Sequence, residues 1–279
     1  MTAMEDRLQE KHFAELTRLI EGHTGIRLPS VKRIMVEGRL RKRVRALGLK
    51  NLAEYGRAIF DGGRLSEEFL HVVDCVTTNK TDFFREPQHF TYLRETAVPN
   101  LLKLRRGGPL KFWSSAASIG AEAYTIAIVL ADLLGLDGPT FAILGTDISR
   151  EVIEQARRAV YPAAFAEPIP QEAQRRYLMF ARDAARAEFR IVPELRARVK
   201  FALLNLMDER FQVDRDFDVI FCRNVLIYFS KASQDGVLRR LCSHLRPGGY
   251  LLLGHSESLA GADHADLRQV APTIFRRAA

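Results

Sequence analysis

Apolar residues recur at intervals of three and four in the first quarter of the chain, and no strand pattern interrupts them. The apolar positions with this spacing include Phe13, Leu16, Leu19, Ile20, Leu52, Tyr55, Ile59 and Phe60. Gly25, Gly48 and the pair Gly62-Gly63 divide the pattern, and glycine commonly follows the last residue of a helix. Residues 5–75 are therefore predicted to form three to five short helices in a small bundle.

From about residue 109 the pattern changes to short apolar runs that alternate with helical patterns. The expected strands are residues 110–114, 141–144, 199–204, 218–222 and 250–253. The expected helices are residues 124–134, 149–159 and 232–245, and Pro247-Gly248-Gly249 is expected to turn into the last strand. Strands that alternate with helices are typical of a parallel, doubly wound sheet. The predicted fold class is α/β and Rossmann-like, preceded by a small all-helical domain.

The segment between the helix ending near residue 159 and the strand at Val199 is about 40 residues long, too many for a loop inside a compact domain. Residues 188–192 alternate as a strand does, and residues 199–203 could pair with them. A small antiparallel β-subdomain is predicted at about residues 162–198, either for partner or substrate contacts or as a structural elaboration. The expected organisation is a helical domain at residues 1–76, a linker at 77–90 and an α/β domain at 91–279.

The formal net charge is +8, and the first 60 residues carry 13 Lys and Arg against 7 Asp and Glu. This balance favours an acidic partner without separating nucleic acid, anionic lipid and an acidic protein surface. The basic face predicted for VEGRLRKRVRALG comprises Arg39, Lys42 and Arg43, with Arg41 and Arg45 alongside. Such a face is either solvated or a docking surface for an acidic helix or for phosphates.

The chain has three cysteines without metal-binding spacing, and its N-terminus MTAMEDRLQE lacks an apolar signal core, which together predict a cytoplasmic protein. The most apolar long segment, residues 123–136, is interrupted by Thr125 and Asp132 and is shorter than the roughly 20 residues of a membrane span. The seven histidines form no HxxxH or HxH pattern, so no metal site is expected.

Small residues follow the first expected strand in WSSAASIG, where a backbone can approach a ligand closely and a helix begins. Asp147 ends the second strand, where its carboxylate can accept hydrogen bonds from both hydroxyls of a ribose. Since GxGxxG and GK[ST] are absent, the pattern favours an adenosine ligand without a pyrophosphate, for which S-adenosyl-L-methionine is the obvious choice. A simple tight turn at Gly120, and a helix N-cap at Asp147 or Ser149, are the alternatives.

The stretch FDVIFCRNVLIYF is the most informative one, because a buried strand ends in the polar pair Arg223-Asn224. Ligands of open parallel sheets bind at the carboxyl ends of the strands, so both the position and the polarity of this pair favour a ligand-binding role. Cys222 precedes this pair inside the expected strand.

The segment TTNKTDFFRE joins the two expected domains, and its polar residues Asn79, Thr81 and Arg85 are interleaved with the pair Phe83-Phe84. A capped helix start with the aromatic pair in an interdomain core explains Thr81 and the phenylalanines, but it leaves Asn79 and Arg85 without a role. An arginine there could hold a carboxylate through two hydrogen bonds.

These segments resemble those of a known family. The blocks are TTNKTDFFRE, WSSAASIGAEAYT, GTDISREVIEQARRAVY, FALLNLMD, FDVIFCRNVLIYF and LRPGGYLLLGHSESL. In order and spacing, over nearly the whole chain, they resemble the chemotaxis receptor methyltransferases, the CheR-type enzymes that methylate glutamate side chains of chemoreceptors. The resemblance implies a helical N-terminal domain and a Rossmann-like methyltransferase domain with an inserted antiparallel subdomain.

The residues that the resemblance implies for cofactor binding are Asn79, Thr81, Arg85, Glu122, Asp147, Asn205, Leu206, Arg223 and Asn224. Glu122 and Asp147 would hold the methionine and ribose ends of S-adenosyl-L-methionine, which would leave as S-adenosyl-L-homocysteine. Tyr228, one helical turn beyond Asn224, would act with Arg85 to place the incoming glutamate. Considered alone, Tyr228 could equally be a core residue with a satisfied hydroxyl.

The implied partners are methyl-accepting chemotaxis receptors, reached through the basic face around Arg39, Lys42 and Arg43. Relatives that dock on a receptor's C-terminal pentapeptide often carry a glycine-rich loop in the inserted subdomain. The matching segment LMFARDAARAEF has no glycine, so the sequence does not favour tethering through such a peptide. The block around Gly120 also departs from the family, with Ile119 before it and Ala121-Glu122-Ala123 after it.

Two other classes of function fit parts of the pattern. A nucleic-acid methyltransferase would account for the basic charge, but it predicts a catalytic Cys or an NPPY-like motif, and neither is evident. A regulatory protein that binds the cofactor without turnover would not need Arg85, Asp147 and Tyr228 together. Receptor methylation remains the favoured interpretation, because a glutamate carboxylate is already ionised at neutral pH and needs no strong base.

Overall fold

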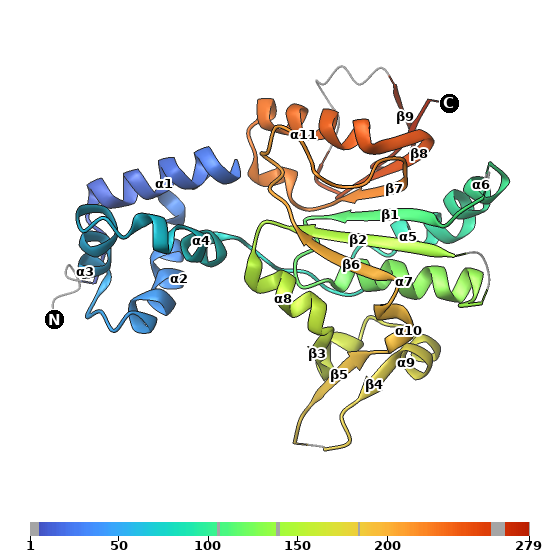
Figure 1. The fold of residues 1–279 in the computed structure, drawn as a ribbon, viewed down its shortest axis with the longest axis horizontal. Helices are drawn as coiled ribbons and strands as arrows, with labels where there is room; N and C mark the ends of the chain where they lie inside the picture. The colour runs from blue at the N-terminus through green and yellow to red at the C-terminus, as the bar shows by residue number, and fades with distance from the viewer. Residues whose placement is uncertain (1–5, 105–106, 138–139, 184, 258–265, 279) are drawn as a thin grey trace. The chain divides into compact units, whose positions relative to one another are not determined.

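The computed structural model describes residues 6–104, 107–137, 140–183, 185–257 and 266–278. It divides into two compact units (Figure 1). The smaller unit comprises Met1–Thr78 and Tyr228–Ser233, and the larger one comprises Asn79–Ile227 and Gln234–Ala279. Ser258 and Leu259 of the last motif, and Ala184 of LMFARDAARAEF, lie outside the described residues.

The smaller unit is helical, as its apolar spacing predicts. Its elements are α1 (Glu10–Thr24), η1 (Ser30–Lys32), α2 (Arg33–Ala46), α3 (Leu52–Gly56), η2 (Arg57–Asp61) and α4 (Leu65–Val76). The buried apolar side chains of the pattern are Phe13, Leu16, Ile20, Leu52, Tyr55 and Ile59. Gly25 ends α1 in the left-handed conformation, with φ of 71°, which a residue with a side chain rarely adopts.

Two arginines of α2 tie this helix to α4. Arg43 donates to both oxygens of Glu68, with Nη2–Oε1 at 2.6 Å and Nε–Oε2 at 3.0 Å. Arg39 donates to the carbonyl oxygens of Val76 (2.9 Å) and Thr77 (2.8 Å), and so caps the C-terminal end of α4. Both side chains therefore hold the helical unit together, while Lys42 stays exposed.

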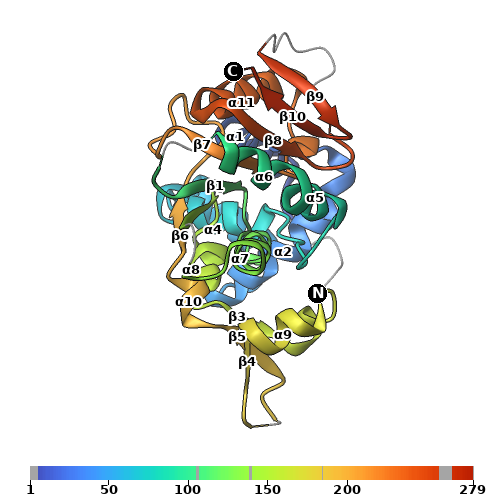
Figure 2. The ribbon, with the colours of Figure 1, turned by 90° about the vertical axis from the view of Figure 1, so that its right-hand side faces the viewer.

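The larger unit contains a mixed sheet. Its strands are β1 (Leu110–Ser115), β2 (Phe141–Asp147), β6 (Val199–Leu203), β7 (Phe217–Cys222), β8 (Leu245–Leu253), β9 (Leu267–Ala271) and β10 (Ile274–Arg277). They lie in the order β6-β2-β1-β7-β8-β10-β9. The first five strands of this order run parallel, whereas β10 is antiparallel to both β8 and β9. Figure 2 shows β8, β9 and β10 beside one another at the C-terminal edge.

Helices connect and cover these strands. They are α5 (Gln88–Tyr92), η3 (Leu93–Ala97), α6 (Val98–Lys103), α7 (Ala121–Leu134), α8 (Arg150–Arg158), η5 (Leu226–Tyr228) and α11 (Lys231–His244). Helices α7 and α8 pack on β2 and β6. Ten of the 14 residues of α7 are buried, because apolar side chains cover most of its circumference. The predicted Rossmann-like fold class is confirmed.

A second, three-stranded antiparallel sheet has the order β3-β5-β4. It consists of β3 (Val160–Pro162), β5 (Glu188–Ile191) and β4 (Leu178–Phe180), with η4 (Ala163–Ala166), α9 (Gln171–Tyr177) and α10 (Pro193–Arg196) around it. Figure 1 shows it apart from the main sheet, and its helices α9 and α10 contact α7. The aromatic rings of Phe83 and Phe189 join it to the linker, with centroids 5.9 Å apart.

Three local predictions are wrong. Residues 199–203 do not pair with residues 188–192, because β6 pairs in parallel with β2 and so belongs to the main sheet. The expected turn at 247–249 lies inside β8, whose pairing with β7 shifts register between Phe217 and Val219. Phe83 is buried within the larger unit's own core, not in an interdomain core.

The chain after β7 also differs from the predicted helix. Asn224 has φ of 58°, in the left-handed region, and a single 3₁₀ turn, η5, follows it before α11 begins at Lys231. Tyr228 is therefore not one α-helical turn beyond Asn224. Within the described residues, no helix is long and apolar enough to cross a membrane.

Candidate active site

The strand order reverses between β1 and β7, and that point defines the candidate site. β1 and β7 are neighbours, and their last residues, Ser115 and Cys222, lie opposite each other. From β1 the chain order continues outward through β2 and β6, whereas from β7 it continues through β8. In open α/β sheets a crevice forms outside the carboxyl ends of the strands at such a switch point, and ligands bind there. The loops that follow β1 and β7 are therefore the first place to look for a site.

Strained backbone is concentrated in these loops and in the linker. Non-glycine residues with positive φ in these segments are Phe84 (53°), Glu86 (57°), Ala116 (60°), Ser118 (51°) and Asn224 (58°). Gly120 completes the β1–α7 loop with φ of 88°, and a Cβ there would lie 2.9 Å from the Phe201 ring. A side chain in this conformation costs of order 1–3 kcal/mol, and such residues cluster at functional sites. Three separate segments near the switch point share this feature.

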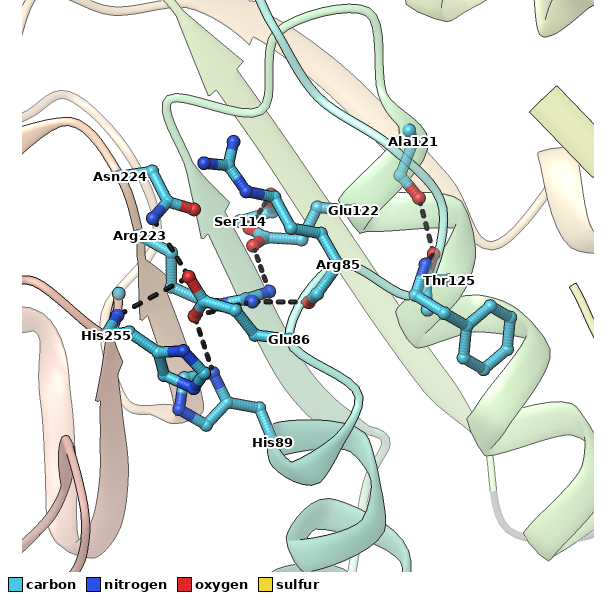
Figure 3. A network of polar contacts seen from close by, with 12 residues as sticks. Arg85, Glu86, His89, Ser114, Ala121, Glu122, Thr125, Arg223, Asn224 and His255 are labelled. Carbon is cyan, nitrogen blue, oxygen red and sulfur yellow. Dashed lines mark hydrogen bonds and ion pairs between the residues drawn. The ribbon is translucent and has the colours of Figure 1, made fainter. Parts of the chain in front are cut away.

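Glu86 is the hub of the polar network in Figure 3. One of its carboxylate oxygens accepts from Asn224 Nδ2 at 3.0 Å, and the other accepts from Arg223 Nη2 at 3.0 Å. Burial alone would raise the pKa of Glu86, but the hydrogen bond from Asn224 and the interactions with Arg223 outweigh it and lower this pKa to about 2. Glu86 is therefore ionised at neutral pH.

Arg223 connects two carboxylates across the switch point. Its side chain is 2% exposed, and Nη1 donates to Glu122 Oε2 at 2.9 Å. Nη2 donates to Glu86 and also to the backbone carbonyl of Arg85. Its guanidinium group stacks on the Phe90 ring at 5.4 Å. The unexplained polar pair after β7 thus has protein partners, since both Arg223 and Asn224 bind Glu86.

Glu122 is the second residue of α7, the helix that follows the β1–α7 loop. It lies in the first turn of α7, where a negative charge is favoured by the helix dipole. Its second oxygen, Oε1, accepts from Ser114 Oγ of β1 at 2.6 Å. Ser114 is fully buried, so this bond fixes the carboxylate against the sheet. Glu122 is thereby held by β1 on one side and by Arg223 on the other.

Asp147 stands at the carboxyl end of β2, beside the β1–α7 loop. Its carboxylate accepts from the backbone N–H of Ser118 (2.9 Å) and from that of Ser149 (3.0 Å). Ser149 is the N-cap of α8, with its hydroxyl accepting from Val152 N–H, so the cap alternative holds for Ser149 and not for Asp147. Each carboxylate oxygen has two lone pairs, which leaves Asp147 able to accept from a ligand hydroxyl.

The linker is fixed to the same loops. Ser118 Oγ donates to the Asn79 carbonyl at 2.9 Å, and the Phe84 N–H donates to Thr125 Oγ1 at 3.1 Å. Arg85 is half-buried, and its guanidinium group donates to the Lys80 carbonyl at 3.0 Å. Figure 3 shows this side chain extending away from the Glu86 carboxylate. The backbone carbonyl of Arg85 therefore belongs to the Glu86 network by accepting from Arg223, whereas its guanidinium group does not.

The other residues predicted for the site are not part of the hydrogen-bonded network described for Glu86. Thr81 is half-exposed in the linker. Asn205 follows β6 and accepts from Met207 N–H at 3.0 Å, and Leu206 is buried. Tyr228 is half-buried and so is not a core residue, and it groups with the smaller unit. There its carbonyl accepts from Arg27 N–H at 3.0 Å, and the Lys32 ammonium lies 5.4 Å from its ring centroid.

The structure brings together four predicted residues, namely Arg85, Glu122, Arg223 and Asn224, around Glu86. Sequence reasoning missed Glu86 itself, although it directly follows Arg85 in TTNKTDFFRE. It also missed Ser118 in WSSAASIG and Glu257 in LRPGGYLLLGHSESL. The signal for both glutamates is the same, because each lies in one of the blocks that carry the family resemblance.

Among the described residues, Glu86, His89 and His255 form a group whose ligand atoms lie within 4.8 Å of one another. Both Glu86 oxygens already have donors, and the Arg223 cation lies 3.0 Å away. Burial, and after it the Arg223 charge, lower the pKa of His89 to about 4, so this ring is neutral at pH 7. A second cation beside Arg223 would be repelled, so the arrangement favours a hydrogen-bonded network over a metal site.

The donor set fits an adenosine ligand with a charged amino-acid end. The β1–α7 loop lacks the spacing that cradles a pyrophosphate, and Asp147 offers lone pairs where a ribose would lie in this fold. Glu122 and Glu86 supply negative charge at the switch point. Cys222 is fully buried, and burial raises the pKa of its thiol well above the usual value, so it is not a thiolate nucleophile.

Comparisons with known proteins agree with this description. The family model described as "CheR methyltransferase, SAM binding domain" matches residues 79–274, and "CheR methyltransferase, all-alpha domain" matches residues 11–77. The chain is 39% identical to the chemotaxis protein methyltransferase of Salmonella typhimurium over 253 residues, which is 91% of this chain and 85% of that protein. It is 38% identical to chemotaxis protein methyltransferase 2 of Pseudomonas aeruginosa, over 94% and 91% of the two chains. The corresponding Borreliella burgdorferi protein is 33% identical, over 97% and 95%.

Proposed function

The chain belongs to the CheR methyltransferase family, and we propose that it transfers a methyl group from S-adenosyl-L-methionine to glutamate side chains of chemotaxis receptors. The product would be a glutamate methyl ester. The observation that carries the proposal is the network at the switch point, where Arg223 joins Glu86 and Glu122 under the linker that bears Arg85.

The cofactor would be held by residues at the carboxyl ends of the parallel strands. Asp147 would accept from the ribose hydroxyls, and Glu122 would attract the ammonium of the methionine end. Asn79, Thr81, Asn205 and Leu206 would line the rest of the pocket. When bound, the cofactor supplies an electrophilic methyl group on a sulfonium ion.

The protein's own residues need to do little chemistry beyond orientation. A glutamate carboxylate is ionised at neutral pH, so no general base is required. Arg85 would bind that carboxylate, and Tyr228 would help to align it, so that proximity and orientation provide most of the rate. The buried, protonated Cys222 fits this scheme, because attack by a thiolate is not part of it.

Receptor docking is proposed to use the exposed cations of α2. Arg39 and Arg43 hold α4 in place, and Arg41 pairs with Asp6 at 2.7 Å, so the charge offered to an acidic receptor helix would come mainly from the exposed Lys42 and Arg45. Charge reversal at Lys42 and Arg45 together is expected to lower receptor methylation while leaving cofactor binding unchanged. Unchanged methylation in this double variant would contradict docking through this face.

The function is tested by incubating the protein with tritiated S-adenosyl-L-methionine and either receptor cytoplasmic fragments or DNA. Base-labile label on the receptor fragment is the expected result, because carboxyl methyl esters hydrolyse in base. Label on DNA would instead support a nucleic-acid methyltransferase. Binding of the cofactor without any transfer would indicate a regulatory protein.

A further inference from the structure

The carboxylate of Glu257 is buried in the segment that follows β8, and it belongs to neither the Glu86 network nor the Asp147 contacts. Its residue is 5% exposed. Oε2 accepts from the backbone N–H groups of Gly254 (2.6 Å) and Asn224 (2.9 Å). Oε1 accepts from those of Val225 (2.9 Å) and Leu226 (2.7 Å). Four amide donors thus surround one side chain.

Three of these donors are consecutive residues of the turn after β7. Asn224 adopts φ of 58°, so the chain leaves the strand abruptly and its next amides cannot continue the sheet pairing. Buried N–H groups without acceptors would each cost about 1–3 kcal/mol. Successive amides that converge on one anion form a concave anion site, and here the anion is the protein's own carboxylate. Burial raises the pKa of Glu257 above its usual value, and the four N–H donors oppose this effect because they stabilise the ionised form.

Gly254 shows how tightly this arrangement is built. A Cβ at this position would lie 2.6 Å from Asn224 Nδ2 and 2.8 Å from both Asn224 N and Glu257 Oε2. The end of β8 therefore approaches the turn after β7 so closely that only glycine fits. Glu257 joins the end of β8 to the turn after β7 by accepting hydrogen bonds from both segments, and the absence of a side chain at Gly254 allows this close approach.

The turn held in this way carries the polar pair of the candidate site. The Asn224 side chain donates to Glu86, and the neighbouring Arg223 binds both Glu86 and Glu122. The turn leads on through η5 to Tyr228, two residues after Leu226 along the chain. A shift of the turn would move the donors to Glu86 and change the position of Glu122, the carboxylate proposed to bind the methionine end of the cofactor.

We propose that Glu257 is a positioning residue, whose carboxylate fixes the Asn224–Leu226 amides and so sets the geometry of Arg223, Asn224 and Glu122 for cofactor binding. Its consequence for catalysis rests on the proposed function. Glu257 acts through the turn and not by contact with the reacting atoms, so it is distinct from the residues proposed to bind the cofactor.

The test uses Glu257→Gln in the full chain, with Glu172→Gln on the exposed surface of α9 as the matched control. Glutamine keeps the shape but replaces one acceptor oxygen by an amide that opposes the N–H groups. We expect hydrogen exchange at Asn224, Val225 and Leu226 to become at least tenfold faster. We also expect the Kd for S-adenosyl-L-homocysteine, measured by calorimetry, to rise at least tenfold. The control variant is expected to match the wild type in both.

Faster exchange with an unchanged Kd would overturn the proposal, because Glu257 would then be only structural. Unchanged exchange would overturn it as well. If Glu257→Gln does not fold, as judged by Trp113 fluorescence, Glu257→Asp decides by the same two measurements, since it keeps the charge on a side chain one methylene shorter. Wild-type protein that binds no adenosyl ligand at all would contradict the proposed function, which is a separate outcome.

Discussion

Each unit pairs an arginine with a carboxylate, half-buried Arg43 in one and buried Arg223 in the other, and the two arrangements differ. In the helical unit, Arg43 donates two parallel hydrogen bonds to Glu68, and no described residue of α2 or α4 has a positive φ. In the α/β unit, Arg223 is shared by Glu86 and Glu122, and two of the residues in its network, Glu86 and Asn224, have positive φ. The first arrangement stabilises the contact between α2 and α4. The second holds strained loops in one position at a switch point, which is what a binding site needs.

The largest expected effect comes from Arg223→Met. It leaves Glu86 and Glu122 buried without their cation, which should destabilise the α/β unit by about 4 kcal/mol, in the range for a broken buried pair. Methyl transfer and cofactor binding should both be lost at temperatures where the variant is still folded. Urea unfolding followed by Trp113 fluorescence measures the stability, because this single tryptophan is fully buried in β1.

Full cofactor affinity in folded Arg223→Met would show that its network is as purely structural as that of Arg43. Arg223→Lys is the matched control. It keeps the charge but has no planar fork to serve two carboxylates, so an intermediate loss is expected.

Arg43→Met should act on the other unit. It leaves the Glu68 carboxylate, whose side chain is 4% exposed, without its cation and with a long hydrogen bond from the Tyr55 hydroxyl (3.4 Å), and it should destabilise the helical unit by about 3 kcal/mol. In a urea titration, helical circular dichroism should then begin to fall at a lower urea concentration than the one at which Trp113 fluorescence changes. Trp113 fluorescence reports on the α/β unit. The affinity for S-adenosyl-L-homocysteine should not change. A loss of affinity comparable to that of Arg223→Met would contradict the view that the Arg43–Glu68 pair is purely structural.

Mild acid should weaken the α/β unit through His89. Its pKa is lowered to about 4 in the folded protein, so between pH 6.5 and 4 the unfolded chain takes up a proton that the folded chain does not. The stability from this ring is therefore complete above pH 6.5 and is lost as the pH falls towards 4. Between pH 7 and pH 5 the loss should be about 2 kcal/mol.

The measurement is the urea midpoint of Trp113 fluorescence at the two pH values. His89→Gln, which does not titrate, should flatten the dependence. An equally steep dependence in that variant would assign the effect to another group. The corresponding loss from Glu86, whose pKa is lowered to about 2, belongs to the range below pH 4.5.

The smallest effects are expected from the helix caps, one in each unit. Ser149 caps α8 and Asn51 caps α3, each with its side chain accepting a backbone N–H. Replacement by alanine should cost about 1 kcal/mol in either case. Since the Ser149 N–H that Asp147 accepts belongs to the backbone, Ser149→Ala should leave cofactor affinity unchanged. A drop in affinity would extend the site to this cap.

The elements were predictable where packing demands a regular pattern. The apolar runs of β1, β2 and β7, and the helical spacing of α1 and α11, follow directly from burial on one side or on both. The hydrogen-bond partners of the polar residues were not predictable in this way. Arg223 lies 137 residues from Glu86 and 101 from Glu122 in the sequence, so their contact depends on the strand order and cannot be read from local spacing.

The basic face of α2 teaches the same lesson. Helical spacing correctly groups Arg39 and Arg43, but it does not reveal that Glu68 and the end of α4 lie opposite them. Likewise, residues 199–203 have the pattern of a strand, and only the sheet decides that β2 is their neighbour. The predictions differed from the structure mainly in contacts between residues far apart in the sequence, and less in local secondary structure.

The most direct test of the central claim is to locate the transferred methyl group on a receptor cytoplasmic fragment by mass spectrometry after incubation with S-adenosyl-L-methionine. The account predicts methyl esters on glutamate side chains, their disappearance after base treatment, and no modification of a fragment whose acceptor glutamates are replaced by alanine. A methyl group on lysine or on nucleic acid, or modification that persists in the alanine fragment, would contradict it.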